Sequence, residues 1–169
     1  MVYDFRTDEV SSALTLQAIH AYIWSLSLTQ AQWFCWSMLT EAEHEKTMDW
    51  THSLHSDLGS YLDALRACLL VFSVTDRRTV PRPFQLSAGL AAYRRTCTIV
   101  NAGTGSGKTL SMAIPLLMDP EAVAIIVSPL KRLQVTQAEE LKRFLIKPLV
   151  INQDVDLSSF QIKVFRIIF

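Results

Sequence analysis

Residues 102–109 read Ala102-Gly103-Thr104-Gly105-Ser106-Gly107-Lys108-Thr109. A short β-branched run, residues 96–101, precedes this stretch, and an apolar segment of helical character, residues 110–117, follows it. A strand, a glycine-rich loop ending in Gly-Lys-Thr and a helix form the context that a phosphate-binding loop requires. The glycines let the backbone turn tightly, so that consecutive N–H groups and the start of the helix face a phosphate. The stretch therefore predicts a site for a nucleoside triphosphate; the alternative is a glycine-rich surface turn with a lysine.

Two side chains of this loop carry the expected chemistry. Lys108 can reach the β- and γ-phosphates of the nucleotide, and the Thr109 hydroxyl can ligate Mg²⁺. We therefore predict Lys108 and Thr109 as catalytic residues, ATP and Mg²⁺ as cofactors, and Thr109 as the metal ligand through ATP. The cofactor-binding residues predicted in the loop are Ala102, Gly103, Thr104, Gly105, Ser106, Gly107, Lys108 and Thr109.

The charge of the chain is distributed unevenly. The chain has 169 residues, half of them hydrophobic, which suits one domain or one domain with an appendage. Residues 1–75 carry three basic and nine acidic side chains, whereas residues 76–169 carry thirteen basic and seven acidic ones. A basic half that holds a phosphate loop suits nucleotide and nucleic acid, and an acidic half does not. The two segments are therefore predicted to differ in origin.

The boundary between these segments is predicted at residues 75–83, which hold a charge cluster and two prolines. Proline at alternate positions, Pro81 and Pro83, prevents a helix and forces an extended connector. The predicted domains are a helical N-terminal segment over residues 1–75 and a nucleotide-binding domain over residues 76–169.

The N-terminal segment shows apolar spacings of three and four, which predict amphipathic helices. We expect helices over residues 7–30 and 31–50, and a third helix that begins at Asp57 or Ser60 and runs through Val71. All the tryptophans and histidines of the chain fall in this segment. An aromatic stripe at helical spacing is typical of a packing surface, and the histidines are expected to face solvent. The residues are Trp24, Trp33, Trp36, Trp50, His20, His44, His52 and His55.

The three cysteines, Cys35, Cys68 and Cys97, are widely spaced in apolar surroundings. They are expected to be buried free thiols in a reducing compartment. The chain begins with acidic residues, unlike a signal peptide, and its longest apolar run, residues 67–74, is too short to span a bilayer. We expect an intracellular protein without a membrane partner, and we favour the nucleus over the cytoplasm.

The basic half is predicted to be an α/β unit with a parallel sheet. Strands are expected over residues 97–101, 122–128 and 149–152, with helices over 84–93, 110–117 and 130–147. The middle strand is a continuous apolar run bounded by prolines, which is typical of a fully buried parallel strand. Pro115 is expected to kink or shorten its helix. The nucleotide would bind at the carboxyl end of the first strand. The tail, residues 160–169, alternates apolar and polar side chains like a further strand.

Three blocks of the basic half resemble a known group of motors. They are Arg82-Pro83-Phe84-Gln85, the loop at 102–109, and Ser128-Pro129-Leu130-Lys131-Arg132-Leu133-Gln134-Val135-Thr136-Gln137. In this order they resemble motifs 0, I and Ia of superfamily 2 helicases, over about residues 80–152. The Ser-Pro-Leu-x-x-Leu-x-x-x-Gln form of the third block points to RecQ-like DNA helicases rather than to DEAD-box RNA helicases.

The resemblance implies a fold and further site residues. The fold is a partial P-loop NTPase (RecA-like) three-layer fold with a parallel sheet, preceded here by the all-helical N-terminal segment. In the family the arginine and glutamine of motif 0, matched by Arg82 and Gln85, read the adenine of ATP; the alternative is an interdomain linker that happens to hold both residues. Motif Ia contacts single-stranded DNA, which assigns nucleic-acid contacts to Ser128, Lys131, Arg132 and Gln137. Here the alternative is that the basic pair merely solvates the start of a helix.

The family hydrolyses ATP with an Asp-Glu box and with an arginine finger from a second motor domain. No Asp-Glu pair follows Lys108, and the acids beyond the third block and its helix are Asp154 and Asp156. We therefore expect a truncated helicase product that binds ATP and single-stranded or forked DNA with little turnover. One alternative is a non-catalytic module whose Trp-rich helices bind a protein partner and whose loop is a relic. A phosphotransferase of the small-kinase type is another, and it leaves Gln85 and the Ser-Pro-Leu block unexplained.

Overall fold

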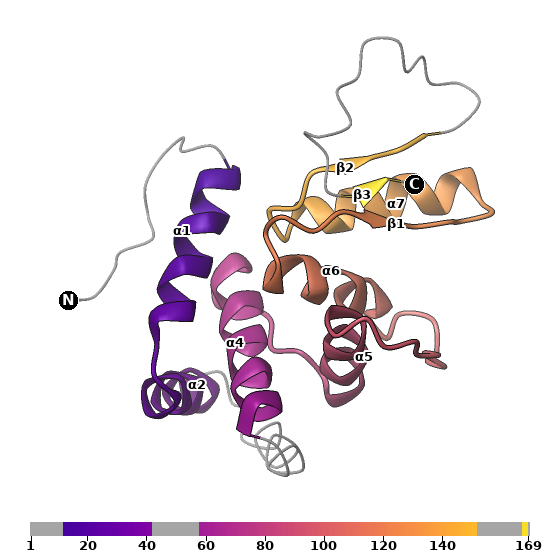
Figure 1. Cartoon of the computed structure of the whole chain (residues 1–169). Helices are drawn as coiled ribbons and strands as arrows, with labels where there is room; N and C mark the ends of the chain where they lie inside the picture. Colours follow the sequence, from indigo (N-terminus) through magenta and orange to yellow (C-terminus); the bar gives the residue numbers. More distant parts are fainter. Residues whose placement is uncertain (1–11, 42–57, 152–166, 169) are drawn as a thin grey trace.

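The N-terminal part of the protein forms helices, as its apolar spacing predicts. The computed structural model describes residues 12–41, 58–151 and 167–168 (Figure 1). α1 spans Ser12–Ser25, α2 spans Leu28–Glu41 and α4 spans Leu58–Val74. The start of the first predicted helix and the end of the second lie outside the described residues.

The helix predicted over residues 7–30 is interrupted after α1. The N–H of Gln30 donates to Ser27 Oγ at 3.3 Å, and the N–H of Ser27 donates to Gln30 Oε1 at 2.9 Å. Such a reciprocal capping box satisfies N–H groups that have no partner at the start of a helix. A new helix therefore begins inside the predicted one.

One hydrophobic cluster joins the N-terminal helices to the helix that follows the glycine loop. This helix, α6, spans Lys108–Met118, and both α1 and α4 contact it. The cluster contains Ile19 of α1, Leu70 of α4 and Leu117 of α6. Figure 1 shows α4 lying between α1 and the pair formed by α5 and α6. The acidic N-terminal segment and the helix of the phosphate loop therefore share a core.

A polar contact ties the same elements together. His20 Nε2 donates to the carbonyl oxygen of Met118 at 2.9 Å, and the His20 ring stacks on Trp24 with ring centroids 3.8 Å apart. The Arg66 guanidinium of α4 lies 4.9 Å from the centre of the Trp24 ring. His20 is thus half-buried, and the expectation that it faces solvent is wrong because the end of α6 offers it an acceptor. The other three histidines lie outside the described residues.

α5 spans Pro83–Tyr93 and packs closely against α6. Gly89 permits this approach, since a Cβ at that position would lie 2.6 Å from Ile114 Cβ. Residues 78–82, before α5, form no helix, as the two prolines predict. Pro115 lies inside α6, and the helix ends three residues later, at Met118.

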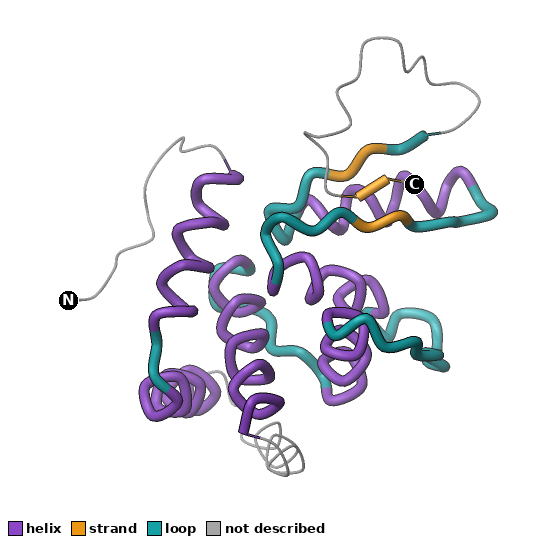
Figure 2. Tube along the Cα trace, viewed as in Figure 1, coloured by secondary structure: helices purple, strands orange, loops and turns teal. Residues whose placement is uncertain are grey.

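Where a parallel sheet is predicted, the described residues form only three strands of two residues each (Figure 2). β1, Ala124–Ile125, and β2, Pro148–Leu149, each pair in parallel with β3, Ile167–Ile168, so that the strand order is β1-β3-β2. β3 falls in the tail predicted as a strand. α7, Lys131–Lys142, contacts both α6 and β2. The extended sheet of a complete three-layer fold stays a prediction.

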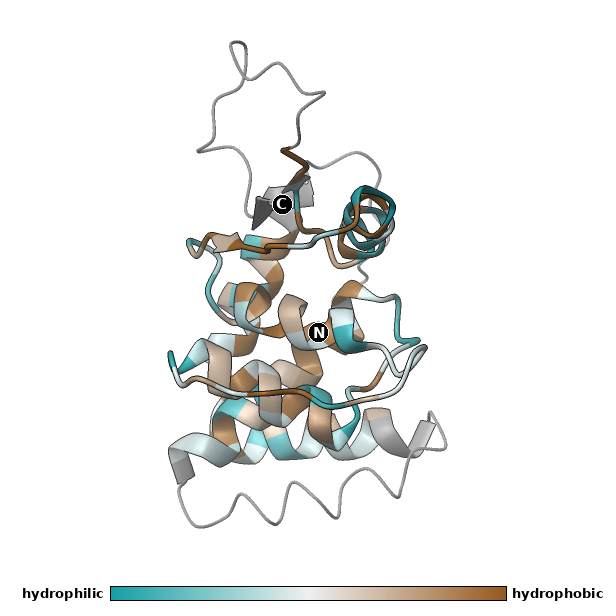
Figure 3. Cartoon of the chain, turned by 90° about the vertical axis from the view of Figure 1, so that its right-hand side faces the viewer, coloured by the Kyte–Doolittle hydropathy of each residue, from teal (hydrophilic) through white to brown (hydrophobic). Residues whose placement is uncertain are grey.

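Three predicted strands differ from the structure. The strand predicted over residues 149–152 shares only Leu149 with β2, and residues 150 and 151 form no strand. Residues 97–101 form a loop, and Ile99 is 96% exposed, because no described segment pairs with this run. The strand predicted over residues 122–128 shrinks to β1, and its exposure alternates, with Val127 92% exposed. A parallel strand is fully buried only when helices cover both faces of its sheet, and one face of this run is open. Figure 3 views the molecule from the side on which the loop between α5 and α6 lies.

Side-chain exposure corrects two further expectations. Cys35 and Cys68 are buried free thiols as predicted, but Cys97 is exposed because its run forms no strand. Trp33 and Trp36 of α2 are 63% and 64% exposed, so the tryptophan stripe is only partly a packing surface within this chain. In the described part of the chain, none of the helices combines the length and apolar character needed to cross a bilayer.

Candidate functional site

The glycine loop has the backbone geometry that a phosphate cradle needs. Gly105 and Gly107 adopt left-handed conformations, with φ of 77° and 79°. Glycine adopts this region without the steric cost that a Cβ imposes. α6 begins directly after Gly107, and no side chain caps its start. The N–H of Leu110 donates to the carbonyl oxygen of Gly107 at 3.1 Å, and no side chain competes with an anionic ligand for the N–H groups before it.

Lys108 folds back over this loop. Its Nζ donates to the carbonyl oxygens of Ala102 and Gly103, both at 2.8 Å. A lysine ammonium group has three N–H donors, so these two bonds leave the third for a phosphate oxygen. The loop therefore holds its lysine close to its own first residues rather than extended into solvent.

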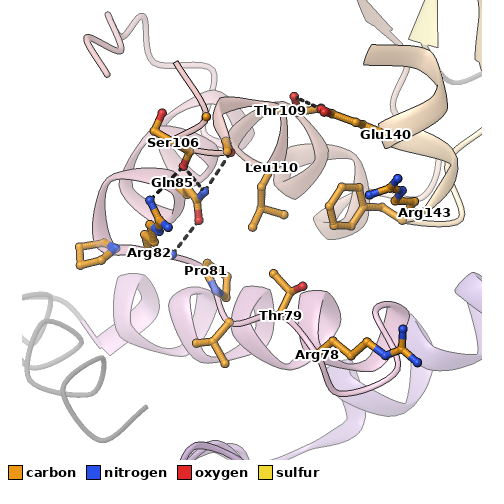
Figure 4. A pocket seen from close by; sticks show the side chains of 15 residues that line it. Arg78, Thr79, Pro81, Arg82, Gln85, Ser106, Thr109, Leu110, Glu140 and Arg143 are labelled. Atoms are coloured by element: carbon orange, nitrogen blue, oxygen red, sulfur yellow. Dashed lines mark hydrogen bonds between the residues drawn. The ribbon is translucent and has the colours of Figure 1, made fainter. Parts of the chain in front are cut away.

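The first turn of α5 is attached to the loop through Gln85, as Figure 4 shows. Gln85 Nε2 donates to the carbonyl oxygens of Ser106 at 3.1 Å and Gly107 at 2.9 Å, and Gln85 Oε1 accepts from the N–H of Arg82 at 2.7 Å. The Arg82 side chain also reaches Ser106 O, at 3.4 Å. The structure thus brings the Arg-x-x-Gln block to the loop, and both N–H donors of the buried Gln85 amide are used on loop carbonyls. Adenine reading by Arg82 and Gln85 stays a prediction.

Thr109 has a partner that the sequence did not indicate. Its hydroxyl donates to Glu140 Oε2 of α7 at 2.6 Å (Figure 4). Glu140 lies 31 residues further along the chain, and the sequence alone shows it only as one charge on an amphipathic helix. The packing of α7 against α6 creates this pair.

A cavity of about 580 Å³ opens beside this pair. The connector, α5, the loop, α6 and α7 all contribute to its lining. Three arginines, Arg78, Arg82 and Arg143, and one carboxylate, Glu140, are its charged groups. The predicted site residues in the lining are Arg82, Gln85, Gly105, Ser106, Gly107 and Thr109. Lys108 does not line this cavity. It lines a smaller cavity of about 280 Å³ together with Ser111 and Met112.

The predicted nucleic-acid residues stand apart from this cavity. Lys131 and Arg132 are exposed on the first turn of α7. Ser128 Oγ and Gln137 Oε1 are buried and make no hydrogen bond among the described residues. Gln134 Nε2 holds the segment by donating to the carbonyl oxygen of Ser128 at 2.9 Å. Lys131 and Arg132 are therefore accessible to a ligand from solvent, whereas Ser128 Oγ and Gln137 Oε1 are not.

The donor set fits Mg²⁺ only in company with a nucleotide. Within the described residues, no three His, Cys, Asp or Glu side chains gather as a metal-binding group. Mg²⁺ in nucleotide sites is held by one or two protein oxygens together with phosphates and waters. Thr109 and Glu140 place one hydroxyl and one carboxylate at the edge of the cavity, which suits such a site.

Comparison with known proteins gives one match. Residues 82–163 match the family described as DEAD/DEAH box helicase. No curated protein matches the chain, and no solved structure does. DEAD/DEAH helicases have a RecA-like fold and use ATP with Mg²⁺. The match supports the interpretation of this part of the chain as a fragment of a superfamily 2 helicase with helicase-type nucleotide binding.

Proposed function

We propose that this chain is the ATP-binding part of a RecQ-like DNA helicase and that it binds Mg²⁺·ATP through residues 102–109. The observation that carries the proposal is the loop itself, with its left-handed glycines and with one N–H donor of Lys108 Nζ left for phosphate. The cavity beside it has a volume of about 580 Å³. This volume falls within the roughly 300–1,000 Å³ that is typical of ligand sites, which supports the proposal that a nucleotide binds beside the loop. Three arginines supply the positive charge that a triphosphate requires.

The division at residues 75–83 belongs to the same proposal, with residues 76–169 as an incomplete RecA-like domain behind a helical segment. The proposed DNA contacts are Lys131 and Arg132, whose exposed cations suit backbone phosphates. Turnover by this chain is proposed to be low because no Asp-Glu pair follows Lys108 in the sequence. Mg²⁺, when bound, neutralises part of the phosphate charge. The proposed location is the nucleus.

Titration with a fluorescent ATP analogue tests the binding step. We expect the wild-type chain to bind in the presence of Mg²⁺ and Lys108→Ala to bind at least about tenfold more weakly, since charge-assisted hydrogen bonds contribute about 1.5–3 kcal/mol. Lys147→Ala, at an exposed lysine after α7, is the matched control. Equal binding by all three proteins would contradict the proposal. An ATPase assay with single-stranded DNA tests low turnover, and robust stimulated hydrolysis would contradict that part.

A second function, a non-catalytic interaction module, is favoured by one observation. Trp33 and Trp36 of α2 are 63% and 64% exposed, and exposed tryptophans are enriched where proteins meet partners. On this reading the loop is a relic, so the wild-type chain and Lys108→Ala would both fail to bind the ATP analogue. Partner binding would then depend on residues 1–75.

A further inference from the structure

The contact between Thr109 and Glu140 lies beside the glycine loop, at the edge of the large cavity. The two side chains come from neighbouring helices, α6 and α7, and both line the large cavity (Figure 4). Glu140 is the one carboxylate among the described residues of that lining. Its neighbour Glu139 is exposed and pairs instead with Lys142 at 2.6 Å.

The direction of the hydrogen bond leaves the lone pairs of the Thr109 hydroxyl oxygen able to bind a cation. An ionised carboxylate only accepts hydrogen bonds, so the hydroxyl hydrogen of Thr109 points to Glu140. A hydroxyl has one hydrogen and two lone pairs. Both lone pairs of Thr109 Oγ1 are therefore turned away from Glu140, and either can bind a cation while the hydrogen bond persists. Binding of Mg²⁺ and pairing with Glu140 are thus compatible.

The Glu140 carboxylate also makes the hydroxyl oxygen of Thr109 a better ligand for a metal ion. A group that accepts a hydrogen bond from a metal ligand fixes the orientation of that ligand and raises its basicity. Mg²⁺ retains several waters in protein sites, and a carboxylate has a second oxygen that can accept from one of them. The other charged residues in the lining are three arginines, so among the described residues Glu140 supplies the negative charge that favours a cation there.

We infer that Glu140 is the carboxylate of the Mg²⁺ site in this chain, acting as a positioning residue that orients the Thr109 hydroxyl toward the metal. The inference rests on the proposed function, because the cation enters with the nucleotide. It assigns to α7 a role in metal binding, although the motif resemblance connects the start of that helix with DNA. It concerns binding of Mg²⁺ and assigns no part of hydrolysis to Glu140.

Glu140→Gln separates this role from simple attachment of α7 to α6. Glutamine keeps the size of the side chain and one oxygen that accepts from Thr109, but it removes the charge. We expect the Mg²⁺ concentration that half-saturates binding of the ATP analogue to rise about 10–100-fold, as for other residues that hold a metal ligand. Binding of Mn²⁺ with the nucleotide, followed by electron paramagnetic resonance, should weaken in parallel. Binding of the analogue in excess EDTA should not weaken. Glu139→Gln should behave as wild type in all three measurements.

Three results would overturn the inference. If Glu140→Gln keeps the wild-type dependence on Mg²⁺, the contact only attaches the two helices. If Glu140→Gln binds the Mg²⁺·nucleotide more tightly than wild type, Glu140 competes with the metal for Thr109. If the wild-type chain binds no nucleotide at all, the proposed function fails first and removes the basis of the inference. Binding that depends on Lys108 but not on Glu140 leaves the proposed function standing and rejects the inference alone.

Discussion

Gln85 and Gly107 are in direct contact, since Gln85 Nε2 donates to the carbonyl oxygen of Gly107 at 2.9 Å. The two residues are 22 positions apart, and the contact joins the first turn of α5 to the end of the phosphate loop. A side chain at Gly107 would require Gln85 to move, because a Cβ there would lie 2.6 Å from the same nitrogen. The conformation of the loop therefore depends on the glycine and on the amide together.

Gly107→Ala is expected to destabilise the folded protein. Gly107 has a φ of +79°, where a non-glycine residue costs about 1–3 kcal/mol, and the new Cβ would displace Gln85. Urea unfolding should show the loss in the free energy of unfolding. Gly103→Ala is the control, since a Cβ at Gly103 would meet nothing within 4 Å. Equal losses in the two variants would show that the contact with Gln85 is not the cause.

Gln85→Glu is expected to loosen the loop. The substitution replaces two N–H donors by a negative oxygen that faces the carbonyl oxygens of Ser106 and Gly107. Leaving such acceptors unpaired costs about 1–3 kcal/mol, so both the free energy of unfolding and the affinity for the ATP analogue should fall. Gln17→Glu, at an exposed position of α1, introduces the same charge as a control. Unchanged nucleotide affinity in Gln85→Glu would show that the first turn of α5 takes no part in nucleotide binding.

The buried thiols should make stability fall at alkaline pH. Burial raises the pKa of the Cys68 thiol from 9.0 to about 12, and burial also raises the pKa of Cys35, with a smaller contribution from Cys68. Above about pH 9 the unfolded chain therefore loses these protons, while the folded protein keeps the Cys68 proton up to about pH 12 and keeps the Cys35 proton above its ordinary range. The unfolded state binds fewer protons in this window, so the free energy of unfolding decreases as the pH rises.

Urea unfolding under reducing conditions at several pH values above 8 measures this effect. The double variant Cys35→Ala/Cys68→Ala should show a shallower pH dependence than wild type, whereas Cys97→Ala, at the exposed thiol, should not. Iodoacetamide at pH 8 should alkylate Cys97 first, because thiolates react and the other two thiols are buried. Rapid alkylation of Cys68 in the folded protein would contradict its burial.

The sequence by itself determined the features that depend on local chemistry. The glycines of residues 102–109 specified the left-handed turns of the loop, and Gly-Lys-Thr specified the start of α6. Pro81 and Pro83 specified an extended connector followed by a helix. Apolar spacing identified α1, α2 and α4, because backbone dihedrals and helical periodicity are properties of neighbouring residues.

Tertiary structure decided which distant residues meet. A strand needs a partner to satisfy its N–H and C=O groups, so the β-branched run at 97–101 did not become a strand where no described segment pairs with it. The pairing of His20 with Met118, 98 positions away, and of Thr109 with Glu140, 31 positions away, follows from helices that pack side by side. Apolar periodicity predicts that α7 has a face to bury. Only the packing of α7 against α6 brings the Glu140 carboxylate, and not another one, to Thr109.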